Sequence, residues 1–83
     1  MIKYQIEFKN IHFFISDNTL LAFIRLLKTI DEDLIYNSNK SGNLKNIRII
    51  YIKSNLSLFE INRLSFQFIQ KYEHLTIYIK TVK

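Results

Sequence analysis

Residues that could perform chemistry are few in this chain, and none stands in a catalytic spacing. There are two histidines, His12 and His74, and no cysteine. Neither histidine has another ligand-type residue three or four positions further on, so we expect structural or solvated roles for both. The single glycine, Gly42, excludes the usual phosphate-cradling loops, which need several glycines. The sequence therefore predicts no enzyme, no cofactor and no metal site.

The acidic run at residues 31–33 is the remaining candidate for a cation site. A calcium loop spreads its oxygen ligands over about 12 residues around a glycine turn. This run is three consecutive residues without glycine, and it follows a predicted helix. We expect a solvated helix end.

The charge balance favours anionic partners, although only weakly. Lysine and arginine give a formal net charge of +5, and such a field attracts nucleic acid or an acidic protein surface. Isoleucine, lysine and asparagine are abundant, whereas alanine, valine and glycine occur once each. This is the composition that AT-rich codons produce, so codon bias explains part of the lysine excess.

Length and patterning predict one domain spanning residues 1–83. The longest apolar run, Leu20 to Ile24, is far shorter than the about 20 residues that cross a bilayer. The first residues alternate between polar and apolar where a secretory signal would be continuously apolar. The absence of cysteine suits a reducing compartment. We expect a soluble, cytoplasmic protein, acting inside a host cell if it comes from a phage or plasmid, with no membrane partner.

The first half of the chain predicts strands followed by a helix. Period-two alternation indicates strands at residues 2–8 and 11–15, joined by a turn at Lys9-Asn10 into a hairpin; one long, bulged strand is the alternative. Ser16 or Asp17 can cap a helix that runs to about residue 30. Its apolar stripe faces the core and consists of Leu20, Phe23, Ile24, Leu27 and Ile30.

The second half predicts a strand, a helix and a strand. Residues 37–43 indicate a loop, and residues 34–37 a short strand before it. Ser57 and Glu60 have capping-box spacing and predict a helix over residues 58–72, with a core stripe of Leu58, Ile61, Leu64, Phe68, Ile69 and Tyr72. The flanking strands each contain the tetrapeptide Ile-Tyr-Ile-Lys, at residues 50–53 and 77–80, and should run parallel.

These elements predict an α+β two-layer sandwich, with a mixed sheet of four to five strands and two helices on one face. The order is β-β-α-(β)-β-α-β. If residues 2–16 form one strand and residues 34–37 another, the order becomes β-α-β-β-α-β, which is similar to the ferredoxin-like arrangement. That likeness implies no function.

Strand alternation predicts a basic, tyrosine-bearing sheet face opposite the helices. The isoleucines of both tetrapeptides must face the helices, which leaves lysine and tyrosine outward. Lysine can neutralise phosphate and tyrosine can stack on unpaired bases; the alternative is an ordinary exposed sheet face. The residues of this predicted face are Lys3, Lys9, Tyr51, Lys53, Tyr78 and Lys80.

Four residues of the second helix lie outside its core stripe and form a line along the helix. Aromatic residues and arginine dominate protein interfaces, so this line predicts a surface for a partner or for a homodimer; the alternative is burial within the chain. The line consists of Phe59, Arg63, Phe66 and Gln70.

Together these features predict a small non-enzymatic binding protein that docks on a protein or ribonucleoprotein. A phage- or plasmid-type inhibitor of a host nucleic-acid-handling complex is one such protein. The alternative is a module that binds RNA or single-stranded DNA through the sheet face. A metal-independent nuclease is a third hypothesis.

Overall fold

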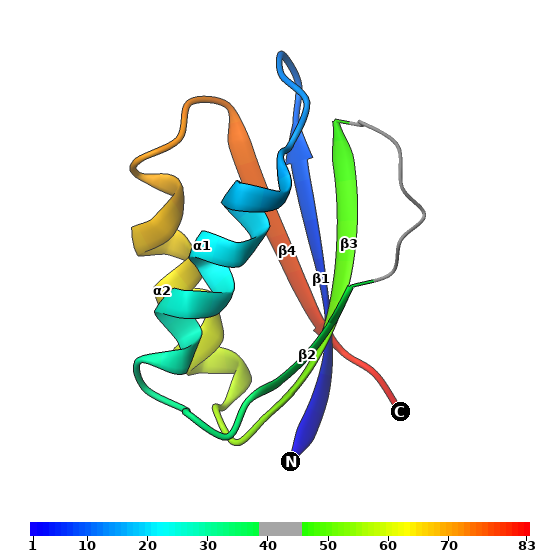
Figure 1. Ribbon diagram of the computed structural model, residues 1–83, viewed down its shortest axis with the longest axis vertical. Coiled ribbons are helices and arrows are strands. Elements are labelled where there is room, and N and C mark those ends of the chain that lie inside the picture. Colours follow the sequence, from blue (N-terminus) through cyan, green and yellow to red (C-terminus); the bar gives the residue numbers. More distant parts are fainter. Residues whose placement is uncertain (39–45) are drawn as a thin grey trace.

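Four strands and two helices follow the order β1-α1-β2-β3-α2-β4 in the computed structural model, which describes residues 1–38 and 46–83. The elements are β1 (Ile2–Asn10), α1 (Asp17–Lys28), β2 (Ile35–Ser38), β3 (Ile47–Ser54), α2 (Leu58–Ile69) and β4 (Leu75–Thr81). Both helices lie on the same face of one sheet (Figure 1). The predicted two-layer α+β sandwich is confirmed, as is the short strand before the loop, here β2.

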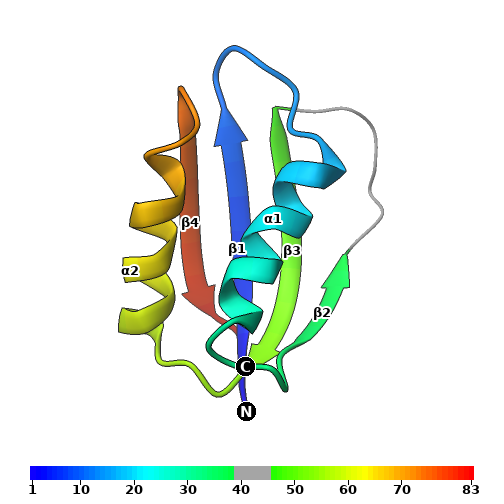
Figure 2. The same cartoon turned by 60° about the vertical axis from the view of Figure 1, so that its left-hand side comes forward.

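The sheet has the strand order β2-β3-β1-β4, and every pair of neighbours is antiparallel (Figure 2). β3 and β4 run parallel to each other, as predicted, but β1 lies between them. The sheet is therefore antiparallel throughout its described strands, where a mixed sheet was expected. This order is the ferredoxin-like arrangement of two split β-α-β units.

The predicted hairpin at residues 2–15 is wrong, because both edges of β1 are occupied by β3 and β4. Neither edge of β1 remains for residues 11–15 to pair with. Asn10 ends the strand: its side-chain oxygen accepts hydrogen bonds from the backbone N–H groups of His12 and Phe13, each at 2.9 Å. These bonds turn the chain out of the sheet, as asparagine commonly does.

α1 begins as predicted and ends earlier than predicted. The hydroxyl of Ser16 accepts a hydrogen bond from the backbone N–H of Thr19 at 3.3 Å, which satisfies a donor at the helix start. The helix ends at Lys28, and Ile30 is 52% exposed, so its place in the core stripe was wrong. The chain turns there, and the turn brings the next residue, Asp31, to the end of β3.

Asp31 is buried, and this corrects the expectation of a solvated helix end. Its Oδ2 accepts hydrogen bonds from the Ser54 hydroxyl at 2.6 Å and from the Asn55 backbone N–H at 2.7 Å. The bond from Ser54, followed by that from Asn55, lowers the pKa of this carboxyl below its ordinary value. Asp31 therefore fixes the end of β3, while Glu32 and Asp33 remain exposed.

α2 begins with the predicted capping box. The Ser57 hydroxyl accepts from the Glu60 backbone N–H, and the Glu60 carboxylate accepts from the Ser57 backbone N–H, both at 3.1 Å. The helix ends at Ile69, before the predicted residue 72. Leu58 is 38% exposed rather than part of the core.

The core lies between the sheet and the helices. Tyr4 and Phe8 of β1 are fully buried, and Phe23 of α1 lies edge-on to Phe8 and to Phe68 of α2, with ring centroids 5.5 and 5.2 Å apart. The Tyr4 hydroxyl donates to the Leu56 carbonyl at 2.6 Å, and burial raises the pKa of this phenol. One layer of aromatic rings therefore joins both helices to β1.

Two expectations concern the limits of the described structure. The predicted loop at residues 37–43 lies mostly outside the described residues, as does Gly42. Within residues 1–38 and 46–83, neither helix is long and apolar enough to cross a membrane.

Candidate binding surfaces

The outer sheet face, which is the face opposite the helices, carries all six residues predicted for it. The inward side chains of β3 are Ile50, Ile52 and Ser54, so the residues between them point outward. Tyr51 is 37% and Tyr78 58% exposed. The lysines predicted for this face are exposed as well, namely Lys3, Lys9, Lys53 and Lys80.

Strand register places like charges directly opposite each other on this face. Lys3 of β1 is the cross-strand partner of Lys53 of β3, and Ile35 of β2 lies on the other side of Lys53. Directly opposed like charges destabilise a sheet. The one carboxylate among the described outward residues of the sheet is Glu7, which is paired with Ile49 and Tyr78. The end of the face around Lys3 is therefore basic without local compensation.

The next row of the face adds an aromatic and a further cation. Gln5 of β1 lies between Tyr51 of β3 and Lys80 of β4. A hollow of about 250 Å³ is lined in part by Lys3, Tyr51 and Lys53. A second hollow of about 140 Å³ is lined by Gln5, Glu7, Tyr78, Ile79 and Lys80. Each hollow thus combines a tyrosine ring with lysine, one on either side of β1.

The α2 ridge, which we define as Phe59, Arg63, Phe66 and Gln70, is exposed along its length. Phe59 is 76% and Phe66 65% exposed. At about 100° per residue, the ridge lies opposite the buried residues Ile61 and Leu64 and points away from the sheet. Burial of these rings within the described part of the chain is therefore excluded.

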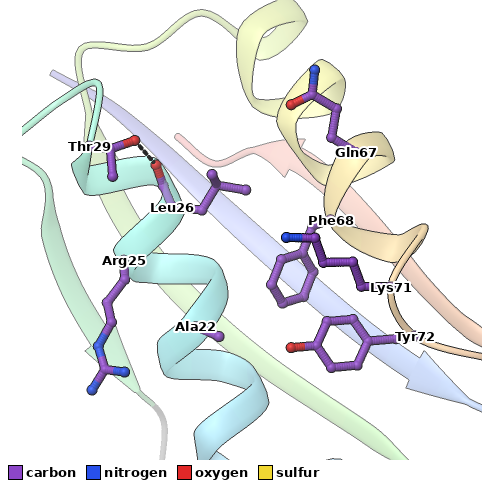
Figure 3. Close-up of a pocket in the computed structure, with 8 residues that line it drawn as sticks. All are labelled: Ala22, Arg25, Leu26, Thr29, Gln67, Phe68, Lys71 and Tyr72. Atoms are coloured by element: carbon purple, nitrogen blue, oxygen red, sulfur yellow. Dashed lines mark hydrogen bonds between the residues drawn. The ribbon is translucent and has the colours of Figure 1, made fainter.

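A groove between the two helices was not predicted. It has a volume of about 420 Å³ and is lined by Ala22, Arg25, Leu26, Thr29, Gln67, Phe68, Lys71 and Tyr72. In Figure 3, the rings of Phe68 and Tyr72 lie on the α2 side and face Ala22 and Leu26 of α1. The Thr29 hydroxyl donates to the Leu26 carbonyl at 2.6 Å. Arg25 and Lys71 make this groove cationic, but its lining contains no candidate nucleophile with a base beside it.

The loop after β1 exposes three large apolar residues, and this too was missed. Ile11, Phe13 and Phe14 are each at least 60% exposed. The sequence alternates there as in a half-buried strand. Only the strand order of the sheet shows that this segment has no strand partner among the described residues. Arg48 fixes the end of this loop, donating to the Ile15 carbonyl at 2.9 Å and to Asp17 at 2.6 Å. Arg48 is thus engaged within the protein.

The fold brings together the two histidines that the sequence keeps far apart. The rings of His12 and His74 are in edge-to-face contact, with centroids 4.2 Å apart. His74 has a φ of 63°, a left-handed conformation that histidine adopts more readily than most residues. Within the described residues, no group of three or more histidine, aspartate or glutamate side chains could hold a metal ion. The pair joins the loop after β1 to the segment before β4.

Comparisons with known proteins add no family to this geometry. A scan against protein-family models and a search of curated proteins find no match to the chain. Among the exposed surfaces of the described residues, the outer sheet face combines the most charge with exposed aromatic rings.

Proposed function

We propose that the protein is a non-enzymatic binding protein whose outer sheet face holds single-stranded nucleic acid. The observation that carries the proposal is the direct opposition of Lys3 and Lys53 on neighbouring strands. Two opposed ammonium groups cost stability in the free protein, and an anion that lies between them relieves this cost. A phosphate backbone supplies such anions in a row.

The tyrosines favour a single strand over a duplex. Tyr51 borders the same hollow as Lys3 and Lys53, so a base could stack on its ring while its phosphate meets the lysines. Such stacking contributes about 1–3 kcal/mol per base. Tyr78 and Lys80 offer a second combination of this kind across β1. Paired bases in a duplex would not expose their faces to either ring.

An intracellular setting belongs to the proposal. The sequence has no cysteine, which suits a reducing compartment. Nucleic acid is accessible to the protein in that compartment. Its partner would then be cellular or invading nucleic acid, free or within a ribonucleoprotein.

The test is fluorescence anisotropy with labelled single-stranded oligonucleotides over a range of salt concentrations. Affinity should fall steeply with salt, with a slope in log–log form of about −0.7 for each phosphate neutralised. Tyr51→Ala should weaken binding by about 5- to 150-fold, given the stacking energy. Lys53→Gln should reduce both the affinity and the salt slope.

A matched variant on the other side of the molecule distinguishes binding at the sheet face from attraction by the net charge of the protein. Lys28 is exposed at the end of α1, and Lys28→Gln removes the same charge as Lys53→Gln. Its affinity should stay close to that of the unchanged protein. Equal losses in the two variants, or no binding at about 50 mM salt, would refute the sheet face as a nucleic-acid site.

A second candidate function is protein docking through the α2 ridge, as in an inhibitor of a nucleic-acid-handling complex. It is favoured by the 76% and 65% exposure of Phe59 and Phe66, because large rings at this exposure are typical interface anchors. Phe66→Asp should leave the fold intact and abolish capture of a defined host protein. Asn62→Asp adds the same charge to an exposed position on α2 outside the ridge and should preserve that capture.

A further inference from the structure

The outer edge of β4 is an open strand edge. β4 pairs with β1 on its inner side and lies at the end of the sheet order; within the described residues no strand covers its outer side. The strand has seven residues and a single charged side chain, Lys80. Natural proteins usually protect such edges with several charges, proline or a bulge, because the unpaired backbone groups recruit another strand.

Backbone alternation identifies which groups of β4 are unpaired. The backbone N–H of Val82, just after the strand, donates to the Lys3 carbonyl of β1 at 2.9 Å. Along an antiparallel strand the backbone groups of successive residues point to opposite sides. Even-numbered residues of β4 therefore bond to β1, and the N–H and C=O groups facing the open edge belong to Leu75, Ile77, Ile79 and Thr81.

The sequence of β4 is nearly symmetric about Tyr78, with Ile77 and Ile79 on either side of it. An antiparallel copy centred on Tyr78 pairs Ile77 with Ile79 of the second copy, and Leu75 with Thr81 of the second copy. All four residues with open backbone groups then lie in hydrogen-bonded positions over the full seven-residue strand. We propose that two copies of this chain form a homodimer in which the two β4 strands pair antiparallel across a two-fold axis at Tyr78.

Charge disfavours one alternative register, the one centred on Lys80. In the proposed pairing, Lys80 lies opposite Thr76 of the second copy. A pairing centred on Lys80 would set two lysines directly opposite each other, which is unfavourable. It would also leave the start of β4 unpaired. The register centred on Tyr78 pairs the whole strand and also keeps the two lysines apart, and its two-fold symmetry is that of most homodimers.

The flank of α2 above this edge is also suited to a second copy. The groove residues Gln67 and Lys71 mark the flank that faces α1. At about 100° per residue, Leu58 and Ile69 lie on the opposite flank, above the open edge, where Leu58 is 38% exposed and Ile69 partly buried. Pairing of the strands would bring these apolar residues near their counterparts, while the α2 ridge stays accessible.

The interface also covers apolar side chains that the single chain leaves incompletely buried. Ile77 and Ile79 face the helices but are only partly buried, since none of the described strands lies beyond them. A neighbouring strand would complete their burial. Burial of apolar surface stabilises association at about 25 cal/mol per Å², which adds to the backbone hydrogen bonds.

The decisive experiment uses single cysteine variants, because the chain has no cysteine of its own. Tyr78 would lie opposite itself in a non-hydrogen-bonded pair, with Cα atoms about 4.5 Å apart, within the range that a disulfide bridges. Mild oxidation of Tyr78→Cys should give a covalent dimer of twice 10.0 kDa. Tyr51→Cys, on the same face but in the interior strand β3, is the matched control and should stay largely monomeric.

Light scattering of the unchanged protein without nucleic acid should give about twice the mass of the chain, so the result does not depend on the proposed function. Ile79→Pro removes an N–H that faces the open edge and should give a folded monomer, checked by circular dichroism. If that variant unfolds, the comparison of Tyr78→Cys with Tyr51→Cys tests the dimer on its own. A monomeric mass at the highest soluble concentration, or equal cross-linking of Tyr51→Cys and Tyr78→Cys, would overturn the proposal.

Discussion

The tetrapeptide Ile-Tyr-Ile-Lys occurs once in the interior strand β3 and once in the edge strand β4, and the two copies differ in burial. In β3, Ile50 is fully buried and Ile52 is 2% exposed. In β4, Ile77 and Ile79 are only partly buried. Tyr51 is 37% exposed in β3, whereas Tyr78 is 58% exposed in β4. Among the described strands, β3 has neighbours on both sides, β2 and β1, and β4 has β1 alone.

This difference separates what the local sequence determines from what the sheet determines. Alternation decides which side chains face the helices, and it does so identically in both copies. The number of neighbouring strands decides how deeply each side chain is buried. The second property depends on strand order, which is set by residues far from the tetrapeptide.

The largest expected difference between the copies is in the cost of truncating an isoleucine. Ile50→Ala should lower the free energy of unfolding by about 2–5 kcal/mol, because it leaves a cavity in a fully buried site. Ile77→Ala should cost about 1–2 kcal/mol, since that side chain is only partly buried. Urea denaturation monitored by circular dichroism measures both values.

Ile35→Ala is the control for an exposed strand isoleucine, because Ile35 is 55% exposed, and it should be nearly neutral. Equal losses for Ile50 and Ile77 would contradict the burial argument. A loss for Ile77→Ala that grows with protein concentration would instead report burial by a second copy of the chain.

A smaller effect is expected at the residue that follows the first tetrapeptide. Ser54 is fully buried; its hydroxyl donates to Asp31 and accepts from the Leu56 backbone N–H at 3.0 Å. Ser54→Ala leaves that N–H without its partner, at a cost of about 1–3 kcal/mol. Thr81, which follows the second tetrapeptide, is exposed, so Thr81→Ala is the matched control and should be nearly neutral.

Ser54→Ala should also change the pH dependence of stability. The hydrogen bond from Ser54 is the main cause of the lowered pKa of Asp31. A carboxyl with a lowered folded pKa contributes stability that is complete above its ordinary value and is lost as the pH falls through the folded pKa. Unfolding curves below about pH 5 should therefore be less steeply pH-dependent in Ser54→Ala. If the pH dependence of unfolding is unchanged in this variant, the hydrogen bond from Ser54 does not lower the pKa of Asp31.

Much of the fold was predictable from local patterns, because capping and alternation act over a few residues. The capping box of Ser57 and Glu60, the Ser16 cap, the inward isoleucines and the short strand β2 were all predicted. The ferredoxin-like strand order was predicted only as an alternative to the hairpin, and the hairpin was wrong because β1 has two strand neighbours. The expected mixed sheet was wrong because β1 lies between the parallel strands β3 and β4, so that every pair of neighbours is antiparallel.

The candidate surfaces show the same division. Alternation placed the lysines and tyrosines on the outer face, but the opposition of Lys3 and Lys53 depends on the register between β1 and β3. Three further features depend on residues that are far apart in the sequence: the contact between His12 and His74, the burial of Asp31 and the interhelical groove. No local spacing predicts them. A signal for the exposed loop was present, since Asn10 is a residue that commonly ends strands in turns.

The smallest expected effect distinguishes the lysines of the two tetrapeptides. Lys53 lies opposite Lys3, whereas Lys80 lies opposite Gln5. Lys53→Gln should therefore stabilise the free protein by about 0.2–1 kcal/mol, and Lys80→Gln should not. The gain should shrink in high salt, which screens exposed charges. If Lys53→Gln both stabilises the free protein and weakens oligonucleotide binding, the opposed lysines are retained at a cost to folding, as a binding role requires. If Lys53→Gln stabilises the protein but leaves oligonucleotide binding unchanged, the opposition of Lys3 and Lys53 plays no part in binding.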